Sequence, residues 1–375
     1  MRGEPPTVLL TTVGLHSAAG TDLYTRDLAS ALLRLHWRPV VYTLLSGAVA
    51  EEVRRRTVPV IDDLGKMTVV PDVIHGHHGL ETLTALLTYP AVPAVFVTHD
   101  GRAWNSIPPV MNRIRAYVAV DENCRDRMVC EYGIPLARTC IMANAVDLQR
   151  FQPRPPLPAR PVRALVFSNA AREDTFVLPV RQACAARGIA LHVMGAGEGT
   201  QAADPENRLP EYDLVFAKGR CALEALAVGT AVVLCDYGGL GTLVTANTVE
   251  HLRRLNFGMR TLQREVTRAA VGEEIDRYEP SDAARASELI RRAADVDLLA
   301  LQFIAIYDEI TREPVTADLA GEAQCVARYL RTLSAGLYAK PAAQTIARRV
   351  LERLRRSRMF TPVAHRIHRW VNLGT

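Results

Sequence analysis

The sequence has no apolar run that approaches the roughly 20 residues of a membrane-spanning helix, and its start, MRGEPPTVLL, is unlike a signal peptide. Both absences favour a cytoplasmic protein. Few aromatic residues are interleaved with the arginines near the C-terminus, so the sequence does not indicate a nucleic-acid partner.

The seven cysteines are scattered along the chain, and no two of them form a CxxC pair. This irregular, odd-numbered set argues against a disulfide framework or a zinc cage. Three histidines, His75, His77 and His78, lie close together, but no other cluster of metal ligands accompanies them in the sequence. We therefore predict no metal site, and we expect these histidines to pack in the interior or to line an acceptor site.

At 375 residues the chain is too long for one ordinary α/β core and suits two domains. Five of the ten residues from Gln152 to Pro161 are proline, and neither a helix nor a central strand continues through such a run. We interpret residues 152–161 as a stiff linker between an N-terminal domain, residues 1–151, and a C-terminal domain, residues 162–340.

Short apolar runs alternate with helix-period segments on both sides of this linker. The predicted strands are residues 8–13, 40–45, 73–75, 94–98, 117–120 and 139–142 before it, and residues 164–167, 189–194 and 214–217 after it. Such alternation is typical of a doubly wound, mostly parallel sheet. The predicted fold class is α/β, with two tandem Rossmann-like domains and a helical C-terminal region that begins near Val249. Ser281 is the expected N-cap of one of these helices.

Residues 341–375 form a basic C-terminal tail. Eight arginines and a single acid lie between residues 346 and 369, with apolar residues on one side of a helical pattern. This segment is either a surface helix docked by its apolar edge or a contact with an anionic membrane face. In the second case the protein would be peripheral at the inner face of the membrane.

The stretch from Tyr212 to Asp236 reads as a strand, a glycine-containing turn, a short helix and another strand. A helix that starts at a turn such as Gly219 directs free N–H groups and the positive end of its dipole toward a phosphate. Lys218 and Arg220 add positive charge there, and Glu224 lies one turn further on, where a carboxylate suits a ribose diol. The pattern therefore predicts a site for a nucleotide diphosphate.

The LEALAVG run at residues 223–229 resembles the ribose-binding helix of GT-B-fold glycosyltransferases, especially their group-1, family-4-like class. IMANAVDLQRF at residues 141–151 is similar to the I-x-N-G-V-D-x-x-x-F motif that closes the N-terminal domain in that class, although Ala145 replaces the glycine. The chain is identified as an atypical member of the class. The resemblance implies metal-independent transfer of a hexosyl-type sugar from a UDP- or GDP-linked donor to an acceptor that the sequence does not identify, with no other cofactor. It also implies that Glu224 holds the donor ribose.

The resemblance assigns further residues to the site. His16 occupies the place of a catalytic base in inverting enzymes, and Gly20 belongs to the glycine loop over the donor diphosphate. His99 matches a histidine that contacts the donor sugar, and Asp100 beside it is a carboxylate able to orient an imidazole or act as a base. Gly238 and Gly239 match a glycine turn that approaches the donor sugar and phosphate.

The chain departs from the family pattern at three places. Phe216 stands where retaining members carry a glutamate, Ser168-Asn169 replaces a phosphate-binding G-R motif and leaves Arg172 as the phosphate ligand, and the glutamate of G-G-x-x-E is absent. Retention or inversion therefore stays open. The alternatives are a nucleotide-sugar epimerase of the same fold and a catalytically degenerate protein that only binds sugar nucleotides.

Overall fold

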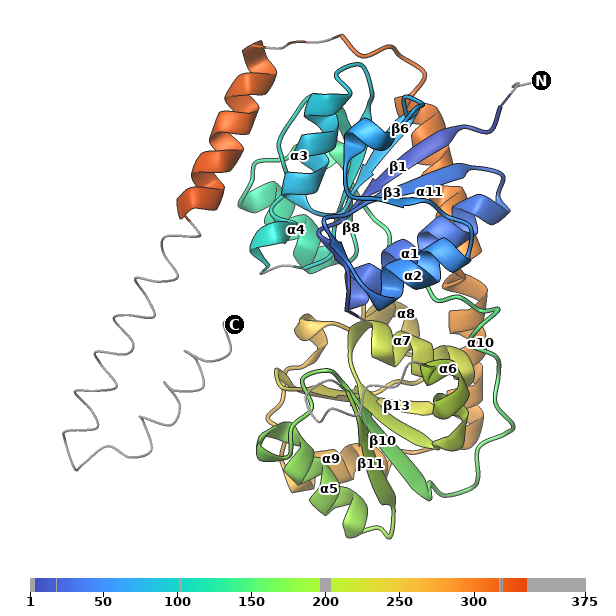
Figure 1. The fold of residues 1–375 in the computed structure, drawn as a ribbon. Coiled ribbons are helices and arrows are strands. Elements are labelled where there is room, and N and C mark those ends of the chain that lie inside the picture. Colours follow the sequence, from blue (N-terminus) through green and yellow to red (C-terminus); the bar gives the residue numbers. More distant parts are fainter. Residues whose placement is uncertain are drawn as a thin grey trace, which may run out of the picture. The chain divides into compact units, whose positions relative to one another are not determined.

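The structure, a computed structural model, describes residues 4–17, 19–100, 103–195, 204–316, 318 and 320–335 (Figure 1). The chain divides into two compact units. The larger unit, residues 1–108 and 113–317, contains the two large β-sheets. The smaller unit, residues 109–112 and 318–375, includes a helix over residues 320–335. The basic segment at residues 346–369 lies outside the described residues.

A seven-stranded parallel sheet forms the first half of the larger unit, in the order β5-β3-β1-β6-β7-β8-β9. Its strands are β1 Thr7–Thr11, β3 Arg38–Tyr42, β5 Val60–Ile61, β6 Val73–Gly76, β7 Ala94–Thr98, β8 Ile114–Ala119 and β9 Thr139–Ile141. The helices of this half are α1 Gly20–Arg34, α2 Ala48–Arg55, α3 Gly79–Thr88 and α4 Glu122–Cys130. The strand order reverses between β1 and β6, so a ligand is expected beyond the carboxyl ends of these two strands.

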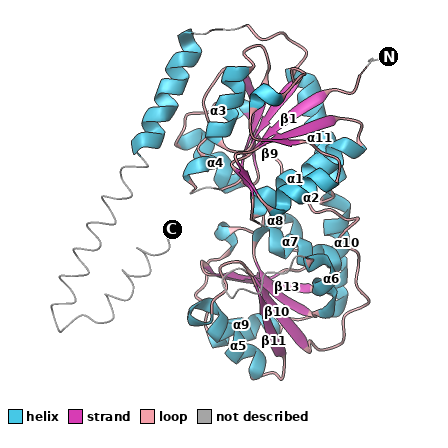
Figure 2. Cartoon of the chain, viewed as in Figure 1, coloured by secondary structure: helices cyan, strands magenta, loops and turns pink. Residues whose placement is uncertain are grey.

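A five-stranded sheet forms the second half, in the order β11-β10-β12-β13-β14. Its strands are β10 Arg163–Phe167, β11 Ala190–Met194, β12 Leu214–Ala217, β13 Ala231–Asp236 and β14 Gly239–Leu243. Only the pairing of β13 with β14 is antiparallel. The helices of this half are α5 Leu178–Ala185, α6 Pro205–Arg208, α7 Gly219–Val228, α8 Val249–Arg254, α9 Arg268–Ile275 and α10 Pro280–Ala293. Helices lie on both sides of each sheet (Figure 2), which gives the predicted pair of Rossmann-like domains.

The helix α11, Val296–Ile310, follows the second half in sequence but packs on the first half, against α1, β7 and β8. The ring of Phe303 lies 4.6 Å from that of His75, and the ring of Tyr307 lies 5.1 Å from that of Trp37, measured between centroids. Just before α11, the Val146 backbone N–H donates to the Ala294 carbonyl at 2.8 Å. The two halves are thus joined twice, by the proline-rich segment and by α11.

Two local predictions need correction. The N-cap of α10 is Glu279 and not Ser281, because the Glu279 carboxylate accepts hydrogen bonds from the backbone N–H groups of Ser281 and Asp282. The strand β14 was not predicted, because its glycines read as a turn. No helix among the described residues is both long and apolar enough to cross a bilayer.

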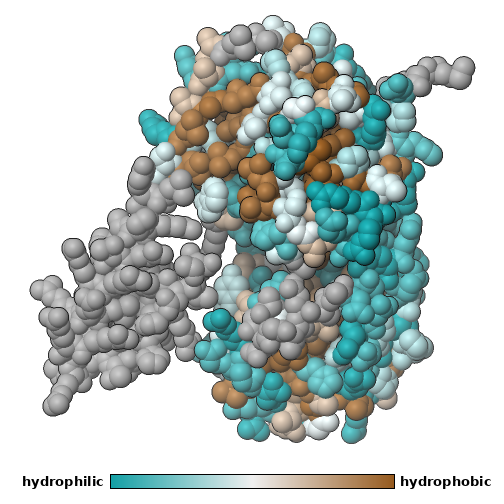
Figure 3. All heavy atoms as spheres, in the orientation of Figure 1, coloured by the Kyte–Doolittle hydropathy of each residue, from teal (hydrophilic) through white to brown (hydrophobic). Residues whose placement is uncertain are grey.

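Hydrophobic side chains gather in patches between hydrophilic ones on the visible face of the first half (Figure 3). Leu44 and Leu45 are among the exposed apolar residues of that half, at 59 % and 49 % exposure. The short strand β4, Leu45–Ser46, pairs with β2, Gly14–Leu15, directly before His16. The loop that carries His16 therefore borders an apolar stretch of surface.

Candidate active site

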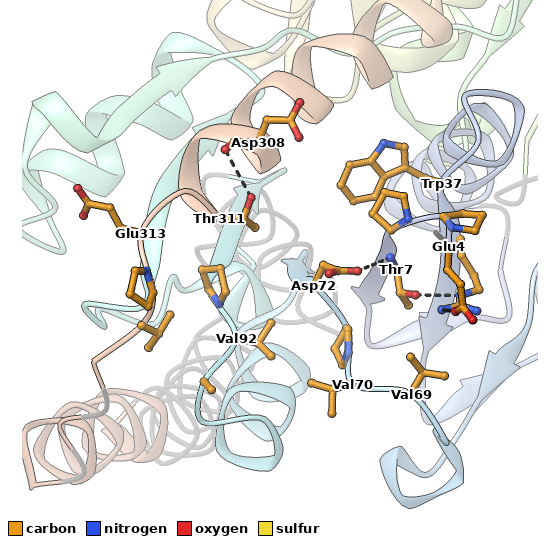
Figure 4. A pocket seen from close by; sticks show the side chains of 18 residues that line it. Glu4, Thr7, Trp37, Val69, Val70, Asp72, Val92, Asp308, Thr311 and Glu313 are labelled. Atoms are coloured by element: carbon orange, nitrogen blue, oxygen red, sulfur yellow. Dashed lines mark hydrogen bonds and ion pairs between the residues drawn. The ribbon is translucent and has the colours of Figure 1, made fainter. Parts of the chain in front are cut away.

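A large cavity lies at the amino ends of the first sheet's strands (Figure 4). It measures about 810 Å³, and its lining includes Thr7, Asp72 and Val92 from the starts of β1, β6 and β7. The Thr7 backbone N–H donates to Asp72 Oδ2 at 2.7 Å. Because ligands of open α/β sheets bind at the carboxyl ends of the strands, we do not assign this cavity to the active site.

A smaller cavity, of about 340 Å³, lies at the carboxyl ends of strands from both sheets. The first half contributes the loop after β1 and the start of α1, and the second half contributes the residues after β10 and β11 and the first turns of α7. It brings together four predicted site residues, His16, Gly20, Arg220 and Glu224. We take it as the candidate active site.

The sequence around α7 folds as its pattern predicts. All four residues of β12 are buried, and Gly219 adopts a φ of +56°, a left-handed conformation that favours glycine and turns the chain into the helix. Gly229 ends the helix with a φ of +98°. No side chain of the described residues caps the start of α7, but the Gly219 N–H donates to the Phe257 carbonyl at 2.8 Å. That N–H is therefore already bonded to a backbone carbonyl and is not available to a ligand.

Arg220 is not the free cation that its position after the turn predicted. Its side chain is only 9 % exposed, and it donates to Glu224 Oε1 at 2.7 Å and to Asp27 Oδ2 of α1. Burial alone would raise the pKa of Asp27, but the charges of Arg220 and Arg26 lower it to about 2. Burial raises the pKa of Glu224, and the charge of Arg220 opposes that shift. The predicted ribose carboxylate is thus already held in place by a guanidinium.

Lys218 also has a carboxylate partner. Its Nζ lies 3.1 Å from Asp236 Oδ2 and 5.6 Å from the centroid of the Tyr237 ring. Asp236 in turn accepts from Ser168 Oγ at 3.0 Å. Unlike Arg220 and Glu224, Lys218 is not among the residues that line the smaller cavity.

Tyr237 and Gly238 connect β13 to β14, and Gly239 is the first residue of β14. Neither glycine belongs to the cavity lining. A Cβ on Gly238 would lie 2.2 Å from Met259 Cε, and Gly239 has a φ of +138° with the Arg264 carbonyl 2.7 Å from an added Cβ. These close approaches within the protein account for both glycines without a ligand, so their contact with the donor stays a prediction.

Arg172 is exposed on the loop after β10 and is likewise absent from the cavity lining. Asn169, at which the sequence departs from the family motif, lines the cavity instead. The cavity also contains Arg26, Glu52 and Arg150, which are not among the predicted site residues. Arg150 could have been predicted as a site residue, because it lies inside the IMANAVDLQRF motif.

His16 is exposed, and two neighbouring glycines leave room for it. A Cβ on Gly14 would lie 2.4 Å from His16 Nδ1, and one on Gly47 would lie 2.6 Å from His16 Cα. Only glycine permits such close packing at these positions. His16 thus lies at the wall of the cavity that also contains Glu224.

His99 directly follows β7 and belongs to a different cluster of side chains, at the carboxyl ends of β6 and β7. Its Nε2 lies 2.9 Å from His77 Nδ1, and its ring packs edge-on against Tyr24 at 4.6 Å between centroids. His75 Nδ1 lies 2.5 Å from the Tyr307 hydroxyl. Asp100, beside His99, is exposed and accepts from the Ala103 N–H at 3.1 Å. Neither His99 nor Asp100 lines the smaller cavity, so their predicted catalytic roles remain predictions.

The packing expected for the histidine cluster is observed. His75 and His77 are fully buried, and His78 Nδ1 accepts from the Val13 N–H at 3.1 Å. Burial lowers the pKa of His77 and of His99 well below the usual range, and neighbouring histidines lower both further. Within the described part of the chain, no group of three or more His, Cys, Asp or Glu residues has a geometry that holds a metal ion.

Acid is expected to destabilise the protein through these histidines. Burial lowers the pKa of His75 to about 3 and that of His78 to about 4, from an ordinary value of 6.5. Below about pH 6.5 the unfolded chain binds protons that the folded protein does not, so each histidine lowers the free energy of unfolding by about 1.4 kcal/mol per pH unit until its folded pKa is reached. Urea denaturation between about pH 7.5 and 5.5 measures this slope, and His75→Gln should reduce it. An identical slope in the variant would contradict the assignment.

Comparisons with known proteins agree with this architecture. The family model described as Glycosyltransferase Family 4 matches residues 18–150. The crystal structure of a glycosyltransferase from Rickettsia africae ESF-5 has 13 % identity and a TM-score of 0.60, and covers 82 % of this chain and 99 % of its own. Anabaena HepE, solved in complex with UDP and glucose, has 14 % identity and a TM-score of 0.58, and covers 81 % of this chain and 100 % of its own.

A sequence comparison with curated proteins finds no match. At such low identities the two solved structures establish the shared fold, while the family model identifies the first half as glycosyltransferase-like. The predicted GT-B fold and the resemblance to group-1 glycosyltransferases are confirmed.

Proposed function

We propose that this chain transfers a hexosyl-type sugar from a nucleotide-diphosphate donor to an acceptor, without a metal ion. The observation that carries the proposal is the 340 Å³ cavity, in which Glu224 of the second half meets His16 and Gly20 of the first. Glu224 would bind the donor ribose, and arginine side chains and the amino end of α7 would stabilise the charge that develops on the departing diphosphate. The UDP and glucose bound to Anabaena HepE support a uridine nucleotide as the first donor to test.

Hydrolysis of nucleotide sugars tests this proposal without knowledge of the acceptor. Glycosyltransferases leak slowly to water when no acceptor is present, so incubation with a panel of UDP- and GDP-sugars should release the free nucleotide from one of them. Mass spectrometry detects that product. Absence of both hydrolysis and binding across the panel would refute the proposal.

The same incubation separates the two alternatives. An epimerase would convert one UDP-sugar into its isomer with no acceptor, and it would release nucleotide only as a minor product. A protein that only binds sugar nucleotides would show affinity without any turnover in the presence of many acceptors. The absent family glutamates, including the one replaced by Phe216, favour this last alternative.

His16→Ala is expected to slow turnover by about 10²- to 10⁴-fold if His16 acts as the general base. Donor affinity and thermal stability should change little, because the side chain is exposed. Steady-state kinetics with the donor found in the screen measure the effect. His251→Ala, at an exposed histidine of α8, is the matched control and should retain full activity. Equal rates for both variants would exclude His16 as the base.

A further inference from the structure

Three arginine side chains surround one buried carboxylate beside the candidate active site. Asp27 of α1 is 1 % exposed. Arg26 Nε donates to its Oδ1 at 2.8 Å, Arg220 Nη2 donates to its Oδ2, and Arg150 Nη1 lies 3.9 Å from Oδ1. The three arginines come from α1, from the segment between β9 and β10, and from α7, and all three line the 340 Å³ cavity.

Each of these arginines also has a glutamate of its own. Arg26 pairs with Glu52 at 2.8 Å, Arg150 with Glu206 at 2.7 Å, and Arg220 with Glu224 at 2.7 Å. Three guanidinium groups and three glutamates already balance in charge. Asp27 is therefore the additional anion of the cluster, and it is the anion that all three arginines share.

The cluster has the chemistry of a phosphate site. Guanidinium groups are planar, permanently charged donors that match phosphate oxygens in pairs. Arg150 Nη1 is buried and has no hydrogen-bond partner among the described residues, so one donor remains to be satisfied. Because the cluster already contains one carboxylate more than its arginines neutralise, a phosphate binds well only if it replaces one.

We infer that Arg26, Arg150 and Arg220 form a phosphate-binding site, and that Asp27 acts as an internal anion which a phosphate group displaces. Asp27 belongs to the first half and Arg220 to the second, so this ion pair joins the halves until the phosphate takes its place. Identification of that phosphate with the donor diphosphate rests on the proposed function. Binding of inorganic pyrophosphate tests the site independently of it.

Asp27→Asn should bind inorganic pyrophosphate about tenfold more tightly than the natural protein, because the neutral amide competes less well for charge-assisted hydrogen bonds. Isothermal titration calorimetry with pyrophosphate, and then with UDP and uridine, measures the change. Asp213→Asn is the matched control. Asp213 is also buried, and its Oδ1 lies 3.1 Å from Arg154 Nη2, but neither residue lines the cavity. Affinity in Asp27→Asn no higher than in the natural protein would overturn the inference.

Arg150→Gln tests the site even if Asp27→Asn does not fold. The Arg150 side chain is 18 % exposed, and its loss should lower pyrophosphate affinity at least about tenfold. Arg154→Gln, which also removes an arginine from an ion pair but lies outside the cavity lining, should leave it unchanged. Equal affinities in these two variants would overturn the inference.

The two proposals fail separately. If the pyrophosphate results hold but no nucleotide sugar binds, the phosphate site stands and the proposed function falls. If nucleotide sugars are turned over while Asp27→Asn and Arg150→Gln leave pyrophosphate and UDP affinities unchanged, the function stands and the arginine site falls.

Discussion

Glu224→Gln is expected to weaken binding of the donor nucleotide by about 10- to 100-fold, the usual loss for a hydrogen bond to a charged group. The carboxylate is 3 % exposed and lines the 340 Å³ cavity. Its Oε1 accepts from Arg220 Nε, whereas its Oε2 makes no hydrogen bond to the described residues and is available to a ribose hydroxyl. Glutamine preserves the volume but replaces that charged acceptor with an amide. Calorimetric titration with UDP, GDP and uridine measures the effect.

Glu274→Gln is the matched control for this prediction. Glu274 is equally buried, at 4 % exposure, and its carboxylate accepts from Arg264, Arg277 and the Leu243 N–H, all outside the cavity. Its replacement should lower thermal stability and leave nucleotide affinity unchanged. If Glu224→Gln bound every nucleotide as tightly as the natural protein, the ribose would have to lie elsewhere.

The parts of this site that the sequence predicts are those set by local conformation. The strand Leu214–Ala217, the turn at Gly219 and the helix end at Gly229 follow from apolar spacing and from two left-handed glycines. Such features depend on neighbouring residues only, so a pattern in the sequence is sufficient to locate them. The same holds for β1, β3, β6, β7 and β8, most of whose residues are buried. The predicted strand at residues 139–142 forms as β9, although Cys140 within it is exposed.

The ion-pair partners of the charged site residues could not be predicted from the sequence. Arg220 is bonded to Asp27, which is 193 positions away in the sequence, and Lys218 is bonded to Asp236 on the next strand. From the sequence both cations appeared available to a phosphate, because nothing local indicates which carboxylate the fold will bring to them. Arg26 and Asp27 likewise resemble an ordinary polar patch on a helix until α7 is placed opposite them.

Gly238 and Gly239 show what a glycine motif leaves open. A glycine pair after a strand permits close approach by any backbone or ligand, and the motif alone does not distinguish the two. In the structure Met259 lies where a Cβ of Gly238 would be, and the Arg264 carbonyl lies where a Cβ of Gly239 would be. A glycine motif therefore indicates that something lies close to the backbone, and only the fold identifies what it is.

Phe303→Ala is expected to lower the free energy of unfolding by about 3–5 kcal/mol, the usual cost of truncating a fully buried phenylalanine. The side chain is completely buried in α11, with its ring 4.6 Å from that of His75 and stacked on that of Tyr307 at 6.1 Å. Because α11 follows the second half and packs on the first, the void left by the missing phenyl ring should destabilise the first half most. Urea denaturation, followed by proteolysis to locate the opened region, measures both effects.

Leu301→Ala on the same helix is the control for this last prediction, because Leu301 is 49 % exposed and its truncation should cost about 0.5 kcal/mol or less. Similar losses in the two variants would mean that α11 contributes through its helicity and not through its buried face. A loss confined to Phe303→Ala would mean that the contact with His75 and Tyr307 holds this returning helix on the first sheet. The histidines at the ends of β6 and β7 would then depend, for their burial and for their low pKa values, on a segment that lies more than 200 residues later in the sequence.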